Sequence, residues 1–400
     1  MALQQQEKEG SQHLPGMGRT ATTTATTTAT AQTANLNKPI VLIGTGNITE
    51  KTIFMNGLYQ NVYFIYRLCE LIGCIPFLFV PEKKPFPAPM DDCRILIPED
   101  VIQQRMPVSV YFEVAMSVDK GMRNFFKGLG ARVCKLYLGN ILNIDTETPM
   151  FHPQMNFSHH IVGGMDEIWV SPHYAQHADY AAVINGLSPA DCKIATYVWE
   201  PELFEQAVGT ATKWLPAVTK EETNFFITEP NISFQKCSII PLLIAEEYFR
   251  QNPTWKGKVF LYNAPQLSIS PFFIKNILPT LELNKQGRIE MRERKDIAEV
   301  LKENPHSIPI CHHVNNEYNY MILELLWAGY PVVHNADSWA EAGYAYSGAS
   351  VEGGAKALKD AVEKGKENKT VTKSQGRILV WKHSIHNPDN QDAWKKLLGV

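Results

Sequence analysis

The 400-residue sequence lacks several features that would assign it at once to a class of protein. No apolar run reaches the length of about 18 residues that a membrane-spanning helix needs. The N-terminal MALQQQEKEG has neither the basic start nor the apolar stretch of a secretory signal. No Lys/Arg-rich run occurs, and the formal net charge is −3. We therefore expect a protein that binds no nucleic acid and does not insert stably into a membrane.

Paired cysteines and metal-binding motifs are missing as well. The seven cysteines are an odd number and form no C-x-x-C pair, which indicates free thiols in a reducing compartment. We therefore expect a cytoplasmic protein, in the host cytoplasm if the chain is virally encoded. His173 and His177 are one helical turn apart but lack the glutamate of H-E-x-x-H, and no D-x-D motif occurs. The sequence thus predicts no cofactor and no metal.

The composition that is present indicates a folded globular protein. Apolar residues make up 44% of the chain and charged residues 20%, and the length favours two domains. Residues 1–36 are the exception, because ATTTATTTATAQTA is nearly pure Ala/Thr and buries too little surface to offset its ordering entropy. We interpret this segment as a disordered tail.

From Lys38 onward, short apolar runs alternate with segments of helical periodicity, which predicts an α/β fold with parallel sheets. KPIVLIGTGN predicts a buried strand, NGLYQNVYFIYRLCELIG a helix with core positions at Leu58, Val62, Ile65, Leu68 and Leu71, and IPFLFVP the next strand. The alternation restarts at NFFITEP and later includes a helix through PFFIKNILPTL. The predicted divisions are a first domain at 37–205, a linker at 206–221, a second domain at 222–376, and a C-terminal segment at 377–400 that crosses back to the first domain.

Ligand groups are expected just after strands, in the cleft that two such domains form. TEPNISFQK follows the strand NFFI, which places Asn231 and Ser233 in a turn and Lys236 in the first turn of the next helix. Free N–H groups and a lysine at a helix start attract phosphate. The alternative is a solvated lysine beside an ordinary helix cap.

The stretch NYMILELLWAGYPVV places Glu324 in an otherwise apolar helix that Gly329 ends. A buried, unpaired carboxylate is costly, so Glu324 must meet either a cleft or a partner. A carboxylate accepts hydrogen bonds from ribose hydroxyls, which is one use for it. The alternative is a core glutamate paired with an arginine or a helix N-terminus.

Other candidates follow predicted strands or begin predicted helices. NGLYQN places Gly57, Gln60 and Asn61 at a helix start, on the side of an acceptor or a phosphate. Without a metal, a diphosphate needs Lys236, a helix end and an arginine such as Arg294 to neutralise its charge. The remaining candidates are the strand-end Glu113 and, in HHVNNEYNY, the polar residues His312, Asn316 and Tyr320.

The segment LELLWAGYPVV resembles part of the retaining, glycogen-synthase-like class of GT-B glycosyltransferases. More closely, six segments resemble, in order, a poorly characterised family of bacterial and viral GT-B-like glycosyltransferases across residues 38–398. They are NGLYQN, MDEIWVSP, YVWEP, EPNISFQK, NEYNYMILELLWAGYPVVHN and GYAYSG. The resemblance implies two Rossmann-like domains that face a cleft, the first for the acceptor and the second for the donor.

The resemblance also implies an activity, which is the metal-independent transfer of a hexosyl or pentosyl group from a nucleotide-diphosphate sugar to a hydroxyl in glycan biosynthesis. Lys236 would hold the diphosphate and Glu324 the ribose, with Asn231, Ser233, Arg294, His312 and Tyr320 around the donor. The class has a further glutamate eight residues before the second one, and this sequence has Asn316 there with Glu317 next to it. Asn316 and Glu113 are therefore the catalytic candidates, and retention of stereochemistry, which the class implies, stays open.

Two alternatives remain at this point. One is a sugar-nucleotide epimerase of similar architecture. The other is a non-catalytic, two-lobed protein that binds a sugar or nucleotide.

Overall fold

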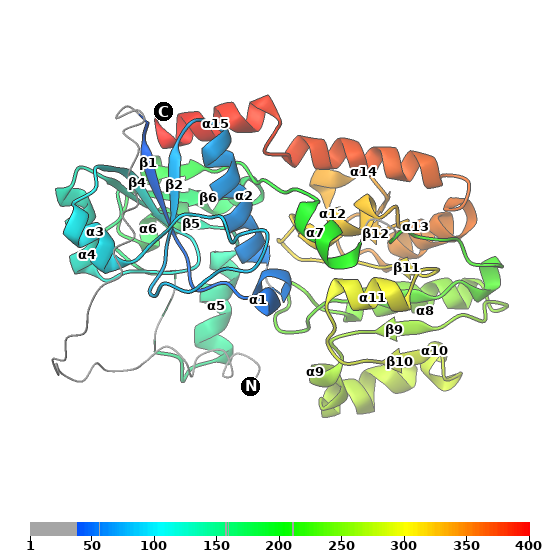
Figure 1. Cartoon of the computed structure of the whole chain (residues 1–400). Coiled ribbons are helices and arrows are strands. Elements are labelled where there is room, and N and C mark those ends of the chain that lie inside the picture. The colour runs from blue at the N-terminus through cyan, green and yellow to red at the C-terminus, as the bar shows by residue number, and fades with distance from the viewer. Residues whose placement is uncertain (1–37, 56, 157, 159, 210–211) are drawn as a thin grey trace, which may run out of the picture. The chain divides into compact units, whose positions relative to one another are not determined.

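The structure is a computed structural model that describes residues 38–55, 57–156, 158, 160–209 and 212–400. The tail predicted at 1–36 lies outside the described residues. Pro39–Val400 form one compact unit in which strands and helices alternate (Figure 1). The boundaries that divide this unit into domains stay a prediction. All seven cysteines are free, as expected.

The first sheet has seven strands, and every neighbouring pair is parallel. Its order is β3-β2-β1-β4-β5-β6-β7, so the direction of winding reverses between β1 and β4. This is the order of a doubly wound Rossmann-like sheet. The strands are β1 Ile40–Gly44, β2 Ile75–Phe79, β3 Ile95–Leu96, β4 Val108–Glu113, β5 Arg132–Tyr137, β6 Glu167–Val170 and β7 Cys192–Ile194.

The helix predicted after β1 is present as α2, Gly57–Leu71. Val62, Ile65 and Leu68 are buried as predicted, but Leu71 is 46% exposed because the helix reaches the surface in its last turn. The further helical segments around this sheet are α1 Glu50–Met55, α3 Pro98–Gln104, α4 Lys120–Gly128, α5 Ile141–Phe151, η1 Pro172–His177, α6 Ala178–Ile184 and η2 Pro189–Asp191.

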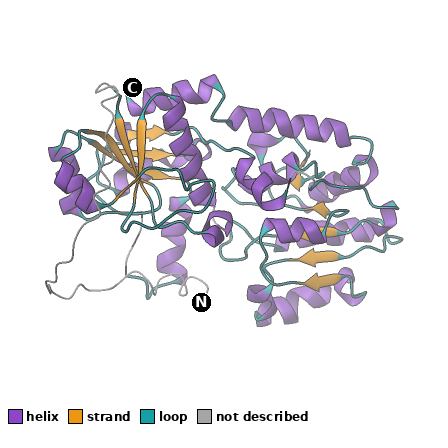
Figure 2. Cartoon of the chain, viewed as in Figure 1, coloured by secondary structure: helices purple, strands orange, loops and turns teal. Residues whose placement is uncertain are grey.

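The second sheet repeats the same winding on a smaller scale. Its order is β10-β9-β8-β11, and an isolated parallel bridge from Ile310 to Val333 leads on to a separate pair, β12 and β13. Figure 2 shows helices flanking the strands of each sheet. The strands are β8 Phe225–Ile227, β9 Val259–Leu261, β10 Ile289–Met291, β11 Ile308–Pro309, β12 Val333–His334 and β13 Tyr344–Ala345.

One predicted helix of this half differs in the structure. PFFIKNILPTL forms a π-helical turn, η4 at Phe273–Ile277, and then a 3₁₀ turn, η5 at Leu278–Thr280. Pro279 has no N–H to donate and its ring crowds the preceding turn, so a regular α-helix cannot continue there. The other helical segments are α7 Glu202–Val208, η3 Lys220–Glu222, α8 Ile239–Gln251, α9 Pro265–Ser268, α10 Glu282–Lys285, α11 Ile297–Glu303, α12 Tyr320–Trp327, η6 Asp337–Trp339 and α13 Val351–Lys364.

Two further helices, α14 at Lys369–His383 and α15 at Pro388–Leu398, complete the chain. Trp394 of α15 is buried, and its indole N–H donates to the Thr196 carbonyl at 2.9 Å. Its ring centroid lies 6.3 Å from that of Phe112 and 6.2 Å from that of Trp169, which belong to β4 and β6. Aromatic burial of this kind attaches the C-terminal helix to the first sheet.

Helix α8 packs closely against α13. A Cβ atom at Gly354 of α13 would lie 2.3 Å from Cδ1 of Ile244 in α8. We expect Gly354→Ala to lower the free energy of unfolding by about 1–3 kcal/mol through overpacking, against its higher helix propensity. Gly128→Ala in α4, where a Cβ meets nothing within 4 Å, is the matched control and should be neutral or stabilising. Equal stability of the two variants in urea denaturation would contradict this packing.

Candidate functional site

The carboxyl ends of β8 and β11 meet at one edge of the second sheet, because the two strands are parallel neighbours. The winding of this sheet reverses between them, which is where α/β folds bind ligands. The chain after β8 carries Glu229 and Lys236, and the chain after β11 carries His312 and His313. The two connections also touch, since the Val314 N–H donates to the Gln235 carbonyl at 2.9 Å.

Asn231 shapes the connection from β8 to α8. Its backbone has φ +56°, a left-handed conformation that asparagine tolerates better than most residues. Its side chain accepts from the Ser238 N–H at 2.8 Å and donates to the Glu229 carbonyl at 2.9 Å. The predicted start of the helix is therefore wrong. These bonds keep the chain in a loop until α8 begins at Ile239, so Lys236 lies three residues before the helix and not in its first turn.

Glu229 and Lys236 interact electrostatically across this loop without a direct ion pair. Glu229 is 2% exposed, and one carboxylate oxygen accepts from the His312 N–H at 3.2 Å. Burial raises the pKa of Glu229 to about 7, and the charge of Lys236 opposes that shift. Burial likewise lowers the pKa of the half-buried Lys236, with Glu229 acting in the opposite direction. Glu229 is not among the residues predicted from the sequence, although it directly follows an apolar strand, where ligand groups are expected.

His312 and His313 are both buried, at 2% and 5% exposure. Burial lowers the pKa of His312 to about 4 and that of His313 to about 3, so both rings are neutral at pH 7. His312 contacts the Tyr346 hydroxyl through Nδ1 at 2.9 Å. The Nε2 atom of each ring is buried and has no hydrogen-bond partner among the described residues. Such groups are costly to leave unpaired, so they point to a missing ligand or water.

Glu324 lies in α12 and is 1% exposed. Burial raises its pKa to about 8, and the neighbouring Gln60 amide acts in the opposite direction. Its Oε2 atom is buried without a partner among the described residues, as are Gln60 Oε1 and Asn61 Oδ1. No arginine or helix N-terminus pairs with this carboxylate in the described part of the chain, so the core-pairing alternative finds no support.

The predicted residues Gly57, Gln60 and Asn61 of α2 therefore meet Tyr320 and Glu324 of α12. A Cβ atom at Gly57 would lie 2.3 Å from Cε1 of Tyr320, so only glycine fits beside this ring. The Asn61 side-chain amide donates to the Gly57 carbonyl at 2.9 Å. The free oxygens of Gln60 and Asn61 are hydrogen-bond acceptors, which suit hydroxyl groups better than phosphate.

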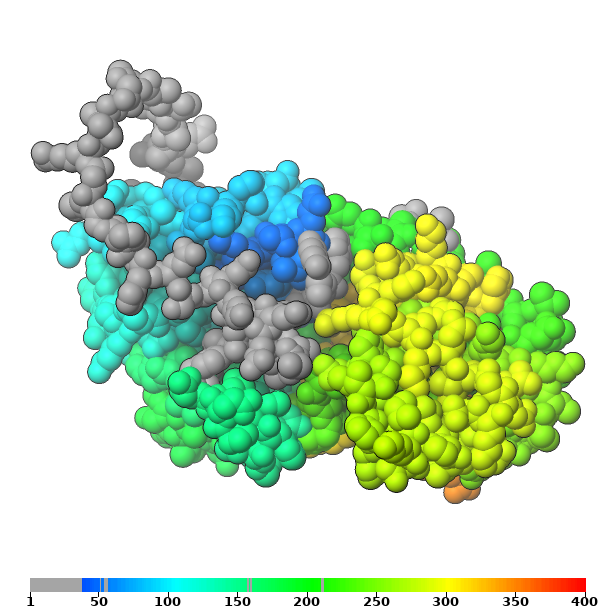
Figure 3. Space-filling model, turned by 90° about the horizontal axis from the view of Figure 1, so that it is seen from below, coloured from blue at the N-terminus to red at the C-terminus, as the bar shows by residue number. Residues whose placement is uncertain are grey.

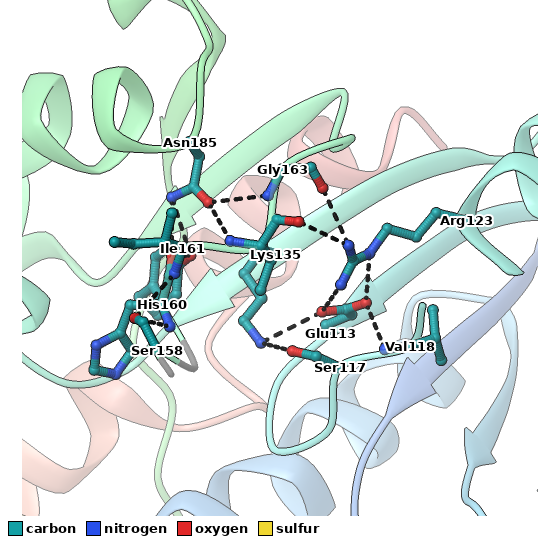
Figure 4. Close-up of polar contacts among 12 residues, drawn as sticks. Glu113, Ser117, Val118, Arg123, Lys135, Ser158, His160, Ile161, Gly163 and Asn185 are labelled. Carbon is teal, nitrogen blue, oxygen red and sulfur yellow. Dashed lines mark hydrogen bonds and ion pairs between the residues drawn. The ribbon is translucent and has the colours of Figure 1, made fainter. Parts of the chain in front are cut away.

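Glu113 lies elsewhere, at the end of β4 in a fully paired cluster (Figure 4). Its carboxylate accepts from Arg123 Nε and the Val118 N–H, both at 3.0 Å, and from Lys135 Nζ at 3.4 Å. Lys135 in turn donates to the Ser117 hydroxyl at 2.8 Å. This pairing favours a structural role for Glu113, and its catalytic role stays a prediction.

The remaining predicted residues differ in their surroundings. Ser233 donates to Glu147 of α5 at 3.0 Å. Asn316 accepts a hydrogen bond from the Tyr174 hydroxyl. Its neighbour Glu317 accepts from the Ser338 N–H at 3.0 Å.

Arg294 is exposed in the connection after β10, a segment that lies on the surface in yellow in Figure 3. Its charge partly offsets the burial that raises the pKa of Tyr320.

Other features of the described residues lie outside this region. Two cavities of about 70 and 390 Å³ open beside α7, and none of the predicted site residues lines them. Among the described residues, no group of three or more His, Cys, Asp or Glu side chains is placed to hold a metal ion. Within the same part of the chain, no helix has the length and apolarity that crossing a bilayer requires.

A family model described as "Protein of unknown function (DUF2827)" matches residues 43–398. The chain belongs to this family. No curated protein matches the sequence of this DUF2827 member.

Solved structures do match the DUF2827 fold. Sucrose-phosphate synthase from Thermosynechococcus elongatus is 12% identical with a TM-score of 0.51, over 90% of this chain and 98% of that one. Anabaena HepE in complex with UDP and glucose is 10% identical with a TM-score of 0.52, over 90% and 100%. An alpha-glucosyltransferase in complex with UDP-glucose and DNA containing an abasic site is 10% identical with a TM-score of 0.54, over 90% and 99%.

These similarities confirm the predicted fold class. The DUF2827 chain has the α/β fold of GT-B glycosyltransferases, which consists of two Rossmann-like domains with parallel sheets. At identities of 10–12% the likeness extends to the fold alone.

The burial of Glu324 predicts a pH-dependent stability. Its pKa is about 8 in the folded protein against an ordinary value of 4.5, so between about pH 5 and 8 the folded state keeps a proton that the unfolded state releases. The free energy of unfolding therefore falls as pH rises through this window, by at most about 1.4 kcal/mol per pH unit. At pH 8 the melting temperature of Glu324→Gln should be higher than that of wild type. The difference between the two melting temperatures should shrink towards pH 5.

The exposed residue Glu363 provides the control, since Glu363→Gln should shift the melting temperature little at either pH. A Glu324→Gln variant less stable than wild type at pH 8 would show that the ionised carboxylate has a partner in the folded protein.

Proposed function

We propose that this chain is a glycosyltransferase that moves a hexosyl or pentosyl group from a nucleoside-diphosphate sugar to an acceptor hydroxyl, such as one on a glycan, without a metal. The bond from the anomeric carbon to the diphosphate oxygen breaks, and the electron pair leaves with the diphosphate. The acceptor oxygen bonds to the same carbon, and its proton passes to the departing diphosphate. Transfer with retention is part of the proposal.

One observation carries this proposal. At the edge where β8 and β11 end, the loop that carries Lys236 contacts the loop of His313, whose buried Nε2–H has no acceptor among the described residues, so two hydrogen-bond donors lie close together. In the same half, α12 presents a buried carboxylate oxygen without a partner. Donors suit the oxygens of a diphosphate, and a carboxylate suits the hydroxyls of a ribose. The named UDP and UDP-glucose complexes among the structural neighbours are consistent with such a ligand.

The chemistry asks mainly for positioning and for stabilisation of charge on the leaving group. Lys236 supplies a cation whose ammonium makes no direct ion pair with a described residue, so its charge is available to a phosphate. The charge of Glu229 opposes the lowering of the Lys236 pKa by burial. Asn231 holds the loop that presents Lys236, and it therefore positions the site without needing to touch the ligand.

Lys236→Met and Glu324→Gln should separate phosphate recognition from ribose recognition. Lys236→Met keeps the apolar stem and removes the charge, so it should weaken UDP by about 1.5–3 kcal/mol and leave uridine almost unchanged. Glu324→Gln should weaken UDP and uridine by similar amounts, because a ribose contact does not involve the phosphates. Isothermal titration calorimetry measures the affinity of each variant for UDP and for uridine. The control is Lys220→Met, which changes an exposed lysine. Wild-type affinity of Lys236→Met for UDP would remove Lys236 from the site.

Metal independence is tested separately. Donor binding and transfer should persist in EDTA, because Lys236 and the N–H donors of the site stabilise the charge of the diphosphate without a metal. Transfer from UDP-sugars, followed by release of UDP, should be the same with EDTA and with added Mn²⁺ or Mg²⁺. Loss of transfer in EDTA that Mn²⁺ restores would contradict this part of the proposal.

A further inference from the structure

The buried histidines of the second half fall into two groups that differ in how their ring nitrogens are satisfied. His334 accepts from the Ala336 N–H through Nδ1 at 3.2 Å, and its Nε2 lies 2.7 Å from the Ala342 carbonyl. His383 accepts from the Trp339 indole N–H through Nε2 at 3.0 Å, and its Nδ1 lies 3.3 Å from the Tyr197 carbonyl. Both rings are fully paired within the protein, as structural histidines are.

His313 has the same tautomer as His334 but lacks its second partner. A backbone N–H can only donate, so the bond from the Asn316 N–H to His313 Nδ1 at 3.4 Å makes Nδ1 the acceptor. The proton of the neutral ring is therefore on Nε2. That N–H is buried and has no acceptor among the described residues. His334 Nε2 lies beside a carbonyl oxygen, whereas His313 Nε2 has no oxygen of the described residues within hydrogen-bond distance.

His173 also has unpaired ring nitrogens, and it lies in a segment that contacts the loop of His313. It belongs to η1, directly after β6, and both of its ring nitrogens are buried without a partner among the described residues. Its ring stacks on Tyr318 with centroids 4.2 Å apart and touches Tyr174 at 3.8 Å. The hydroxyl of the next residue, Tyr174, donates to the Asn316 side chain, and the Asn316 N–H donates to His313 Nδ1, so η1 contacts the loop that carries His313. Lys236 adjoins the same loop, because the carbonyl of its neighbour Gln235 accepts from the Val314 N–H at 2.9 Å.

We propose that His313 and His173 complete a diphosphate subsite around Lys236, in which His313 Nε2–H and a ring nitrogen of His173 donate to phosphate oxygens. This inference rests on the proposed function and extends it to two residues outside the donor set predicted from the sequence. Three nitrogen donors from three connections then surround an anion: one after β6, one after β8 and one after β11. An anion with several acceptor oxygens satisfies all of them together, which a single water cannot do.

The geometry of the rings provides matched variants. In His313→Gln the longer side chain returns an amide N–H to the position of Nε2, whereas in His313→Asn the amide reaches only the position of Nδ1. His173→Phe keeps the stacking on Tyr318 and removes both ring nitrogens. The exposed His386 is the control, as His386→Asn.

Calorimetry with UDP, uridine and inorganic pyrophosphate tests the subsite. His313→Asn and His173→Phe should each weaken UDP and pyrophosphate about 10- to 100-fold and uridine by less than about threefold. His313→Gln should recover most of the loss. If a variant fails to fold, ¹⁵N spectra of histidine-labelled wild type provide a second measurement. His313 should be protonated at Nε2, and that resonance should move when pyrophosphate is added.

The outcomes separate this inference from the proposed function. Unchanged UDP affinity in His313→Asn, while Lys236→Met loses affinity, overturns the subsite and leaves the glycosyltransferase proposal standing. Equal losses for UDP and uridine identify the histidines as structural and overturn the subsite as well. Pyrophosphate binding that depends on His313, with no binding of any nucleoside diphosphate, supports the subsite and contradicts the proposed donor. If wild type binds neither UDP nor pyrophosphate, the subsite and the proposed function are both overturned.

Discussion

Parallel pairing of β8 with β11 is the constraint on which the candidate site depends. Parallel strands end at the same edge of a sheet, so residues more than 80 positions apart in the chain become neighbours without any local interaction between them. Glu229 reaches the backbone of His312 in this way, and Lys236 comes close to His313. The site is therefore a consequence of strand order, and the loops only adjust which atoms face one another.

Burial at this edge has an electrostatic consequence. Burial raises the pKa of Glu229 and of Glu324 and lowers that of Lys236. It therefore favours the neutral form of each side chain. Neutral, unpaired groups in an interior are unfavourable unless something else satisfies them. The buried Glu113 shows the opposite case, because Arg123 pairs with its carboxylate. After β8 and β11, by contrast, Glu229 has a partner in the His312 N–H, but the Nε2 atoms of His312 and His313 have none among the described residues, and this is why we assign these rings to binding.

The sequence predicted the architecture well because it is encoded locally. Apolar runs ending in glycine or asparagine gave the strands, and helical spacing gave α2, with only Leu71 misplaced at its end. The site was predicted less well, because its geometry arises between connections. The start of α8 depends on the side chain of Asn231 closing a loop, which no periodicity shows. Glu113 and Glu324 look alike in sequence, as single carboxylates among apolar residues, and only their partners in the fold separate them.

The central claim is that the edge formed by β8 and β11 binds a nucleoside diphosphate. The most direct measurement is a crystal structure of the protein soaked with UDP. The account predicts density for the diphosphate beside Lys236 and His313 and for the ribose beside the Glu324 carboxylate. Density for UDP at another surface, or an unliganded protein whose ordered waters satisfy every free nitrogen and oxygen of the site at saturating UDP, would contradict it.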